Sequence, residues 1–138
     1  MKKFIIFLIL VSLCLNLYAD IIFDEICSFL NDKHQVLAYN IPTHWVGKSI
    51  TGRGYVLKAN KDIFDKVTLY LSTSKYKYNP DNIQIIVYVK DDYKKEALKY
   101  KKGDYIYFDG TVIVVSKIEK QIFVGNTVVS RYREVINR

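Results

Sequence analysis

The chain has 138 residues, a length that suits one domain, and half of them are hydrophobic, which is enough for a packed core. Six glycines and two prolines exclude a collagen-like or low-complexity chain, and twelve tyrosines favour half-buried sheet faces. The formal net charge of +7 allows acidic partners such as nucleic acid, anionic lipid or acidic polysaccharide, but we favour the simpler interpretation that it keeps a small protein soluble.

Residues 1–19 have the features of a secretory signal peptide. Lys2 and Lys3 form a positive start, and residues 4–15 form an apolar run that is short for a membrane-spanning helix. We expect cleavage after Ala19, which leaves 19 Lys and Arg against 14 Asp and Glu, a net charge of +5. The protein is then exported to the periplasm or cell envelope of a bacterium, with no stable transmembrane segment.

Two alternatives stay open for this end of the chain. Residues 4–15 can instead be retained as a membrane anchor, or the lipobox-like sequence VSLC at residues 11–14 can place a lipid on Cys14. Leu13 stands where a lipobox usually has a small residue. After cleavage only Cys27 remains, so no intramolecular disulfide can form, and its apolar neighbours predict a buried, inert thiol.

Residues 20–46 are predicted to form a helix and an irregular connection. The helix, residues 20–32, begins with acidic residues that suit the positive end of a helix dipole, namely Asp20, Asp24 and Glu25. Its apolar stripe is expected to pack on the chain's own domain and consists of Ile22, Phe23, Ile26, Cys27, Phe29 and Leu30. The connection runs from His34 through Ile41-Pro42, and we expect Trp45 and Val46 to cover an end of the core.

From residue 47 the apolar pattern changes to a period of two, which predicts strands over residues 48–58, 66–72 and 83–89. The positions expected to face inward are Ile50, Gly52, Gly54 and Val56, then Val67, Leu69 and Leu71, then Ile83, Ile85, Val87 and Val89. In the second and third strands the outward positions are Thr68, Tyr70, Gln84, Ile86 and Tyr88.

The remaining elements complete the pattern of a small barrel. Asp91 and Asp92 are expected to start a short helix over residues 93–101 by accepting free N–H groups, with Ala97, Leu98 and Tyr100 able to touch the barrel. A turn at residues 102–104 leads into a fourth strand, 105–115, bent at Gly110. A fifth strand, 122–130, has a kink at Gly125-Asn126 and precedes a polar tail at 131–138.

This order of elements predicts one mainly β domain, a five-stranded Greek-key barrel over residues 47–130, with an N-terminal helix and a short helix between strands three and four. Two segments carry a family resemblance. Leu98, Gly103-Asp104, Gly110 and Val112 resemble the motif L-x-x-G-D-x-V-x-x-x-G-x-V of OB-fold proteins, with a slightly longer spacing after the leucine, and ITGRGYV at residues 50–56 resembles their first strand. The sub-groups that the chain resembles most are the tRNA-anti-like and the periplasmic bacterial OB-fold proteins, many of them small and exported.

The resemblance implies a ligand-binding face on strands two and three, between the loops that join strands one to two and four to five. It assigns candidate ligand-binding roles to Thr68, Tyr70, Gln84 and Tyr88 on the face, Lys61 in the first loop, and Lys75, Tyr76, Lys77 and Tyr78 after strand two. The flanking loops also offer Lys58, Asn60, Phe64, Lys66, Lys117 and Lys120. Tyrosines provide stacking surfaces and lysines attract phosphates, although nearby aspartates and Glu119 offset several of these lysines.

We expect no catalysis, cofactor or metal site. His34 and His44 have no ligand partners at suitable spacing, and no nucleophile motif or phosphate-binding glycine loop occurs. The first hypothesis is therefore an exported, non-enzymatic binding module for a protein, a glycan or another envelope component. The alternative is a single-stranded nucleic-acid or oligonucleotide-binding protein, which is less favoured because export separates it from cellular nucleic acid. A third is an envelope protein that self-associates through residues 20–32.

Overall fold

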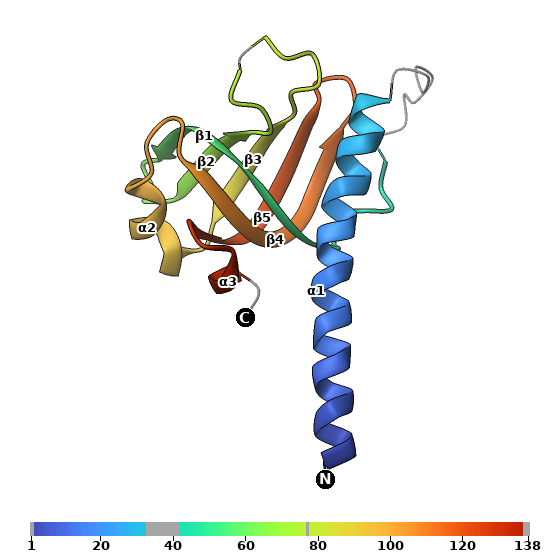
Figure 1. Ribbon diagram of the computed structural model, residues 1–138. Helices are drawn as coiled ribbons and strands as arrows, with labels where there is room; N and C mark the ends of the chain where they lie inside the picture. Colours follow the sequence, from blue (N-terminus) through green and yellow to red (C-terminus); the bar gives the residue numbers. More distant parts are fainter. Residues whose placement is uncertain (1, 33–41, 77, 137–138) are drawn as a thin grey trace.

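The computed structural model describes residues 2–32, 42–76 and 78–136 (Figure 1). It contains a long first helix and five strands, which are α1 (Lys2–Asn31), β1 (Ser49–Lys61), β2 (Val67–Ser72), β3 (Gln84–Val89), β4 (Tyr105–Ser116) and β5 (Gln121–Ser130). A 3-10 turn, η1 (Asp91–Tyr93), and a short helix, α2 (Lys94–Leu98), lie between β3 and β4, and α3 (Arg133–Ile136) follows β5.

The strands form a closed barrel in the order β1-β2-β3-β5-β4. Four pairings are antiparallel, and β3 with β5 is the parallel one. The long β1 closes the barrel because its first half pairs with β4 and its second half with β2. Five coiled strands in this order, with a helix between the third and the fourth, define an OB-fold. The predicted fold class is confirmed.

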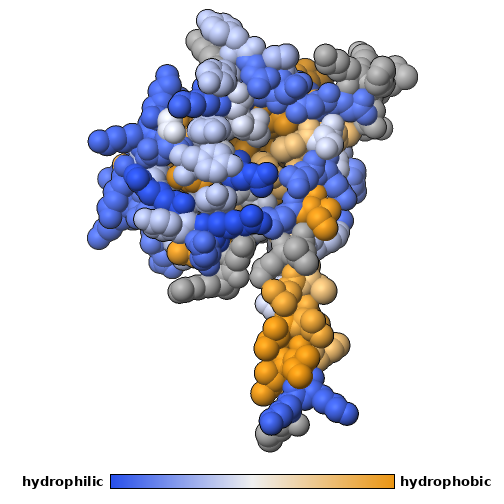
Figure 2. Space-filling view, in the orientation of Figure 1, coloured by the Kyte–Doolittle hydropathy of each residue, from blue (hydrophilic) through white to orange (hydrophobic). Residues whose placement is uncertain are grey.

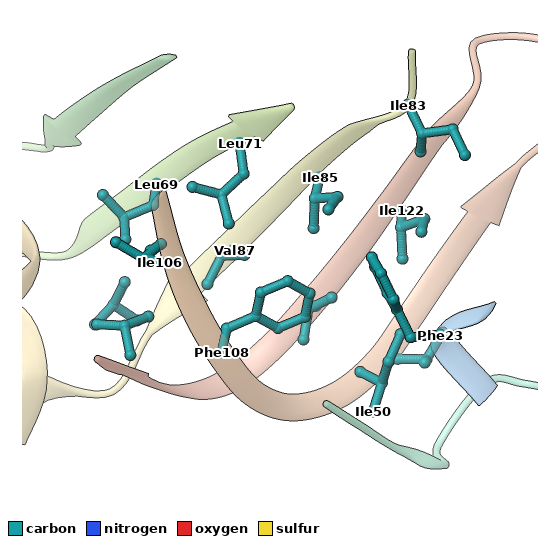
Figure 3. Close-up of a cluster of buried hydrophobic side chains, with 14 of the residues drawn as sticks. Phe23, Ile50, Leu69, Leu71, Ile83, Ile85, Val87, Ile106, Phe108 and Ile122 are labelled. Carbon is teal, nitrogen blue, oxygen red and sulfur yellow. The ribbon is translucent and has the colours of Figure 1, made fainter. Parts of the chain in front are cut away.

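The barrel interior is filled by the alternating apolar positions of all five strands. Phe108 lies fully buried among them, and Figure 3 shows Phe23 entering the cluster from α1 beside Ile50 and Ile122. The rings of Phe23 and Phe108 meet edge to face, with centroids 5.9 Å apart. The inward positions predicted for β1, β2 and β3 are all buried, because a period of two sends alternate side chains into the barrel.

The helix α1 has two parts with different surroundings. From Ala19 onward its apolar stripe covers one end of the barrel, as predicted, with Ile22, Ile26 and Leu30 almost fully buried. The preceding apolar part projects away from the barrel (Figure 1), and Figure 2 shows it as a hydrophobic surface with a hydrophilic tip. By length and composition alone, α1 meets the test for a membrane span, which a signal sequence near the N-terminus also passes.

Several details of the predicted elements are wrong. The helix begins at Lys2 rather than Asp20, because no glycine or proline interrupts residues 2–31, so the acidic residues lie in its middle. Asp91 and Asp92 do not cap the following helix through their side chains, and Asp91 instead binds Lys66. Trp45 covers the core as predicted, whereas Val46 and Leu98 are exposed. The predicted connection from His34 to Ile41 lies outside the described residues.

The two predicted irregularities in the last strands are present. A register shift separates Asp109 and Thr111, at the position of Gly110. A Cβ atom on Gly110 would stand 2.6 Å from Thr127 Oγ1 and 2.8 Å from the Gly125 carbonyl oxygen, so a close approach of β5 requires this glycine. Asn126 adopts a left-handed backbone with φ of 51°, which kinks β5 next to this contact.

Candidate ligand-binding face

The outer side chains of β2, β3 and β5, together with two from the end of β1, form three rows across the barrel that are set by the strand register. The first row contains Asn60, Thr68 and Tyr88, the second Lys58, Tyr70, Ile86 and Phe123, and the third Ser72, Gln84 and Gln121. We call this surface the β2–β3–β5 face. The register thus brings together the four predicted site residues of the second and third strands, namely Thr68, Tyr70, Gln84 and Tyr88.

The middle row is apolar at its centre and positive at one end. Ile86 is only 5% exposed although it points outward, because it stands between Tyr70 and Phe123 in the register. Lys58 Nζ lies 4.6 Å from the centroid of the Tyr70 ring, a cation–π contact. The row therefore offers a ligand the partly exposed rings of Tyr70 and Phe123, with a cation beside Tyr70.

The two outer rows add hydrogen-bonding groups on either side of the middle row. Gln121 Nε2 donates to Gln84 Oε1 over 2.7 Å, which orients both carboxamides. Within the described part of the chain, the other polar atoms of the two carboxamides form no further hydrogen bond, so they can meet a ligand. On the other side, Tyr88 is exposed and its cross-strand neighbour is Thr68. Rings, carboxamides and hydroxyls are all groups that can contact a ligand.

The loop between β1 and β2 borders one end of the face and presents an apolar tip. Asp62 Oδ1 accepts hydrogen bonds from the backbone N–H groups of Phe64 and Lys66, both over 2.9 Å. This turn leaves Ile63 92% exposed and Phe64 76% exposed. The structure of the loop is thus fixed by its own aspartate, while its largest side chains reach into solvent.

The lysines around this loop are held by aspartates. Asp65 binds Lys61 over 2.8 Å and Lys94 over 2.5 Å, and these hydrogen bonds lower the pKa of Asp65 to about 2. Lys66 binds Asp91 over 3.0 Å. Lys61 is therefore paired with Asp65 within the protein, and its contact with a ligand stays a prediction.

The loop between β2 and β3 borders the opposite end and presents tyrosines. Asn82 Oδ1 accepts from the Ser74 backbone over 3.1 Å, and Ser74 Oγ accepts from the Tyr76 backbone over 3.1 Å, so polar side chains order the loop. Tyr76 and Tyr78 are 75% and 90% exposed, and Lys75 is also exposed. The predicted site residue Lys77 lies outside the described residues.

The loop between β4 and β5 differs from its predicted role. Lys117 Nζ donates to the carbonyl oxygens of Phe29 and Asp32, and Lys120 Nζ donates to the Asn31 side chain over 3.1 Å and to a backbone carbonyl of the neighbouring loop. These lysines stabilise the C-terminal end of α1, where free carbonyls concentrate negative charge. The expectation that they face a ligand is wrong.

Sequence reasoning missed several residues around the face. Phe123 was missed because the predicted binding surface did not include β5. The alternation of inward and outward residues along β5 already indicated that Phe123 faces outward, and it pairs with Ile86. Ile118, at the tip of the β4–β5 loop, is 83% exposed, and no sequence signal separated it from a core isoleucine. Outside the face, on β1 and β4, the ring of Tyr105 lies 4.8 Å from that of Tyr55 and 5.6 Å from that of Tyr107.

No family model and no curated protein matches the sequence. Similar solved structures include an aspartyl tRNA synthetase from Entamoeba histolytica, 17% identical with a TM-score of 0.45 over 64% of this chain and 19% of that chain. A single-stranded DNA binding protein from Thermus aquaticus is 15% identical with a TM-score of 0.44 over 61% and 39%. The S. pombe Stn1-ten1 complex is 14% identical with a TM-score of 0.42 over 70% and 73%.

This chain therefore spans well under two thirds of the first two of these proteins. The assignment of this chain's fold as an OB barrel rests on the strand order and the connecting helix described above.

Proposed function

We propose that this chain is an exported, non-enzymatic OB-fold binding module of the bacterial cell envelope, which holds an uncharged glycan or polypeptide chain along the β2–β3–β5 face. OB barrels use this face for polymeric ligands such as oligosaccharides and oligonucleotides. The observation that carries the proposal is the apolar row of Tyr70, Ile86 and Phe123, with the Gln84–Gln121 carboxamide pair beside it. Amphipathic rings contact the apolar side of such a ligand, and carboxamides bond its polar groups.

The charges around the face favour a ligand without phosphates. Lys61 and Lys66 pair with aspartates, and Lys117 and Lys120 hold the end of α1. Lys58 and Lys75 remain outside the ion pairs among the described residues. Since each phosphate contact by a lysine or arginine strengthens binding to nucleic acid, this leaves few cations for a phosphate backbone.

The proposal is tested by capturing ligands from an envelope fraction with the purified protein as bait, followed by titration calorimetry of the captured component. Replacing both Tyr70 and Tyr88 with alanine is expected to reduce affinity at least tenfold through lost ring contacts. The control is Tyr132→Ala, because Tyr132 is exposed but lies outside the face, near the C-terminus. Equal binding by the double variant and the control, both folded, would remove the β2–β3–β5 face from consideration.

A second candidate is a single-stranded nucleic-acid binder that uses the same face. It is favoured by Lys58 above the Tyr70 ring, since a cation beside a stacking surface suits a base and its phosphate, and by the exposed Lys75 and Tyr76. An oligonucleotide binder loses affinity steeply as salt rises, and replacing Lys58 or Lys75 with glutamine should each lower the slope of that dependence by about 1. An unchanged slope in both variants rejects this candidate.

A further inference from the structure

A separate cleft of about 230 Å³ lies between α1 and the outside of the barrel. Its walls come from α1, from β1 and β4, and from both ends of the β2–β3 loop, and none of its lining residues belongs to the rows of the β2–β3–β5 face. In the view of Figure 2, with β1 and β4 toward the reader, paler apolar surface lies between hydrophilic side chains beside the upper part of α1.

Two opposite charges line this cleft without neutralising each other. Asp24 comes from α1 and Arg53 from β1, and neither forms an ion pair within 4.0 Å with any described residue. Both act on the thiol of Cys27, which also lines the cleft: burial raises the pKa of Cys27 to about 12, Asp24 adds to this rise, and Arg53 opposes it. A carboxylate and a guanidinium therefore face one small space.

The other residues that line the cleft supply both hydrogen-bonding groups and apolar surface. Tyr105, from β4, lines the cleft together with Arg53 and contributes a phenolic hydroxyl. Asn31 and Thr73 add hydrogen-bonding groups, while Phe23 and Ile83 supply buried apolar surface. A ligand that satisfies this set must carry both charges at short range, together with an apolar part.

We propose that this cleft binds a free apolar α-amino acid as its zwitterion, with the carboxylate at Arg53, the ammonium at Asp24 and the side chain against Phe23 and Ile83. Sites for drug-sized ligands measure about 300–1,000 Å³, so a volume of about 230 Å³ calls for a smaller molecule. The planar guanidinium is well suited to a carboxylate through two parallel hydrogen bonds.

The same pair of charges excludes ligands that carry only one of them. A phosphate or other dianion meets repulsion from Asp24, and a simple amine meets repulsion from Arg53. An acidic amino acid is repelled by Asp24 in the same way, and its second carboxylate would lose water against the apolar wall of Phe23. Leucine satisfies all three requirements, and its derivatives allow each charge to be removed separately.

The test is an NMR titration that follows backbone amide signals of the purified protein. The protein is expressed from its full sequence, so that any natural processing of the N-terminus takes place. The probes are L-leucine, N-acetyl-L-leucine and L-leucinamide. Leucine is expected to shift the amide signals of Cys27, Asn31 and Thr73 and to saturate. Removing either charge from the probe is expected to weaken binding at least tenfold. The amides of Tyr70 and Tyr88 should not move, which keeps this site distinct from the face of the proposed function.

Two variants make the test specific for the two charges. Arg53→Gln is expected to bind leucine and leucinamide equally, and Asp24→Asn is expected to bind leucine and N-acetyl-leucine equally. Arg131→Gln is the control, because Arg131 pairs with Asp104 and does not line the cleft. The proposal is overturned if leucine does not saturate the wild-type protein, if either derivative binds as well as leucine, or if the two folded variants keep the wild-type preferences.

Discussion

At the residue scale, Gly52 is the point at which the helix and the barrel meet. A Cβ atom there would stand 2.5 Å from Phe108 Cζ and 2.7 Å from Phe23 Cδ2. The missing side chain is what allows Phe23 of α1 to reach Phe108 at the centre of the core. The sequence indicated a reason for glycine in this strand, namely coiling, but it could not show that a ring from a distant helix occupies the space.

Gly110→Val is expected to lower the free energy of unfolding by about 1–3 kcal/mol, the usual cost of overpacking. The new side chain would collide with Thr127 and with the backbone at Gly125, which cannot give way easily. Urea denaturation measures the loss. Ser49→Val places the same side chain at an exposed strand position and should change stability by less than about 0.5 kcal/mol. Equal losses in the two variants would contradict the close approach.

Cys27 is expected to react slowly with thiol reagents in the native state. Burial, together with the charge of Asp24, raises its pKa to about 12, whereas an unfolded cysteine ionises near pH 8.5. The native thiol therefore stays protonated at pH 8, and only the thiolate attacks the reagent. The rate at which Cys27 is labelled at pH 8 is measured with and without denaturant by mass spectrometry of its peptide, because Cys14 is also a free cysteine and is exposed. Rapid labelling of Cys27 in the folded protein would contradict the assignment.

At the scale of elements, the strands were predictable and the loops were not. The alternation of apolar residues predicted both ends of every strand to within three residues of the observed ends. This works because side chains along a half-buried strand alternate between the core and the solvent with a period of two residues. The roles of lysines in loops depend on which neighbours the fold brings close. Lys117 lies 88 positions from Phe29 in the sequence, and no local pattern indicates that it caps that helix.

In the candidate face too, local sequence predicted the strand positions but not the contacts between distant segments. The outward positions of β2 and β3 followed from the strand period, so the register placed Thr68, Tyr70, Gln84 and Tyr88 together as predicted. The contribution of Phe123 depends on the parallel pairing of β3 with β5, a contact between segments that are far apart in the sequence. Which lysines remain available depends on ion pairs that form only after the loops are in place.

The docked part of α1 is expected to behave as part of the core. Ile26→Ala removes a side chain with no exposed surface and should cost about 2–5 kcal/mol in the free energy of unfolding. Ile21→Ala is the matched control on the same helix, because Ile21 is half exposed, and it should change stability by less than about 0.5 kcal/mol. Denaturant titration compares them, and equal midpoints would show that the helix does not dock.

At the scale of the whole molecule, α1 links the apolar N-terminal segment to the barrel without a break. Ala19 is buried, Lys48 Nζ lies 3.3 Å from the Tyr18 hydroxyl, and Asp20 binds Arg133 over 3.1 Å. Cleavage after Ala19 would remove the buried Ala19 and the contact of Tyr18 with Lys48, but it would keep the ion pair between Asp20 and Arg133. Asp20 would then lie at the start of a shorter helix, where its charge suits the helix dipole.

We expect the protein isolated from an envelope fraction to begin at Asp20. Intact mass spectrometry decides this, because the three forms of the chain differ in mass. A chain that retains residues 2–19 would instead be a membrane-anchored barrel, and a lipid mass on Cys14 would identify a lipoprotein. Either result would contradict cleavage after Ala19, while leaving the assignment of the ligand-binding face unaffected.

The closure of the barrel limits how a ligand can be recognised. Each of the five strands has a neighbour on both sides, since β1 joins β2 to β4. Among the described residues, a polypeptide ligand thus finds no open strand edge that it could extend by main-chain hydrogen bonds. In the proposed complex only side chains, such as Tyr70, Phe123 and the Gln84–Gln121 pair, would hold the ligand. Because these contacts would recur with each unit of a repeating polymer, we expect such a ligand to be able to shift along the face by one unit at a time.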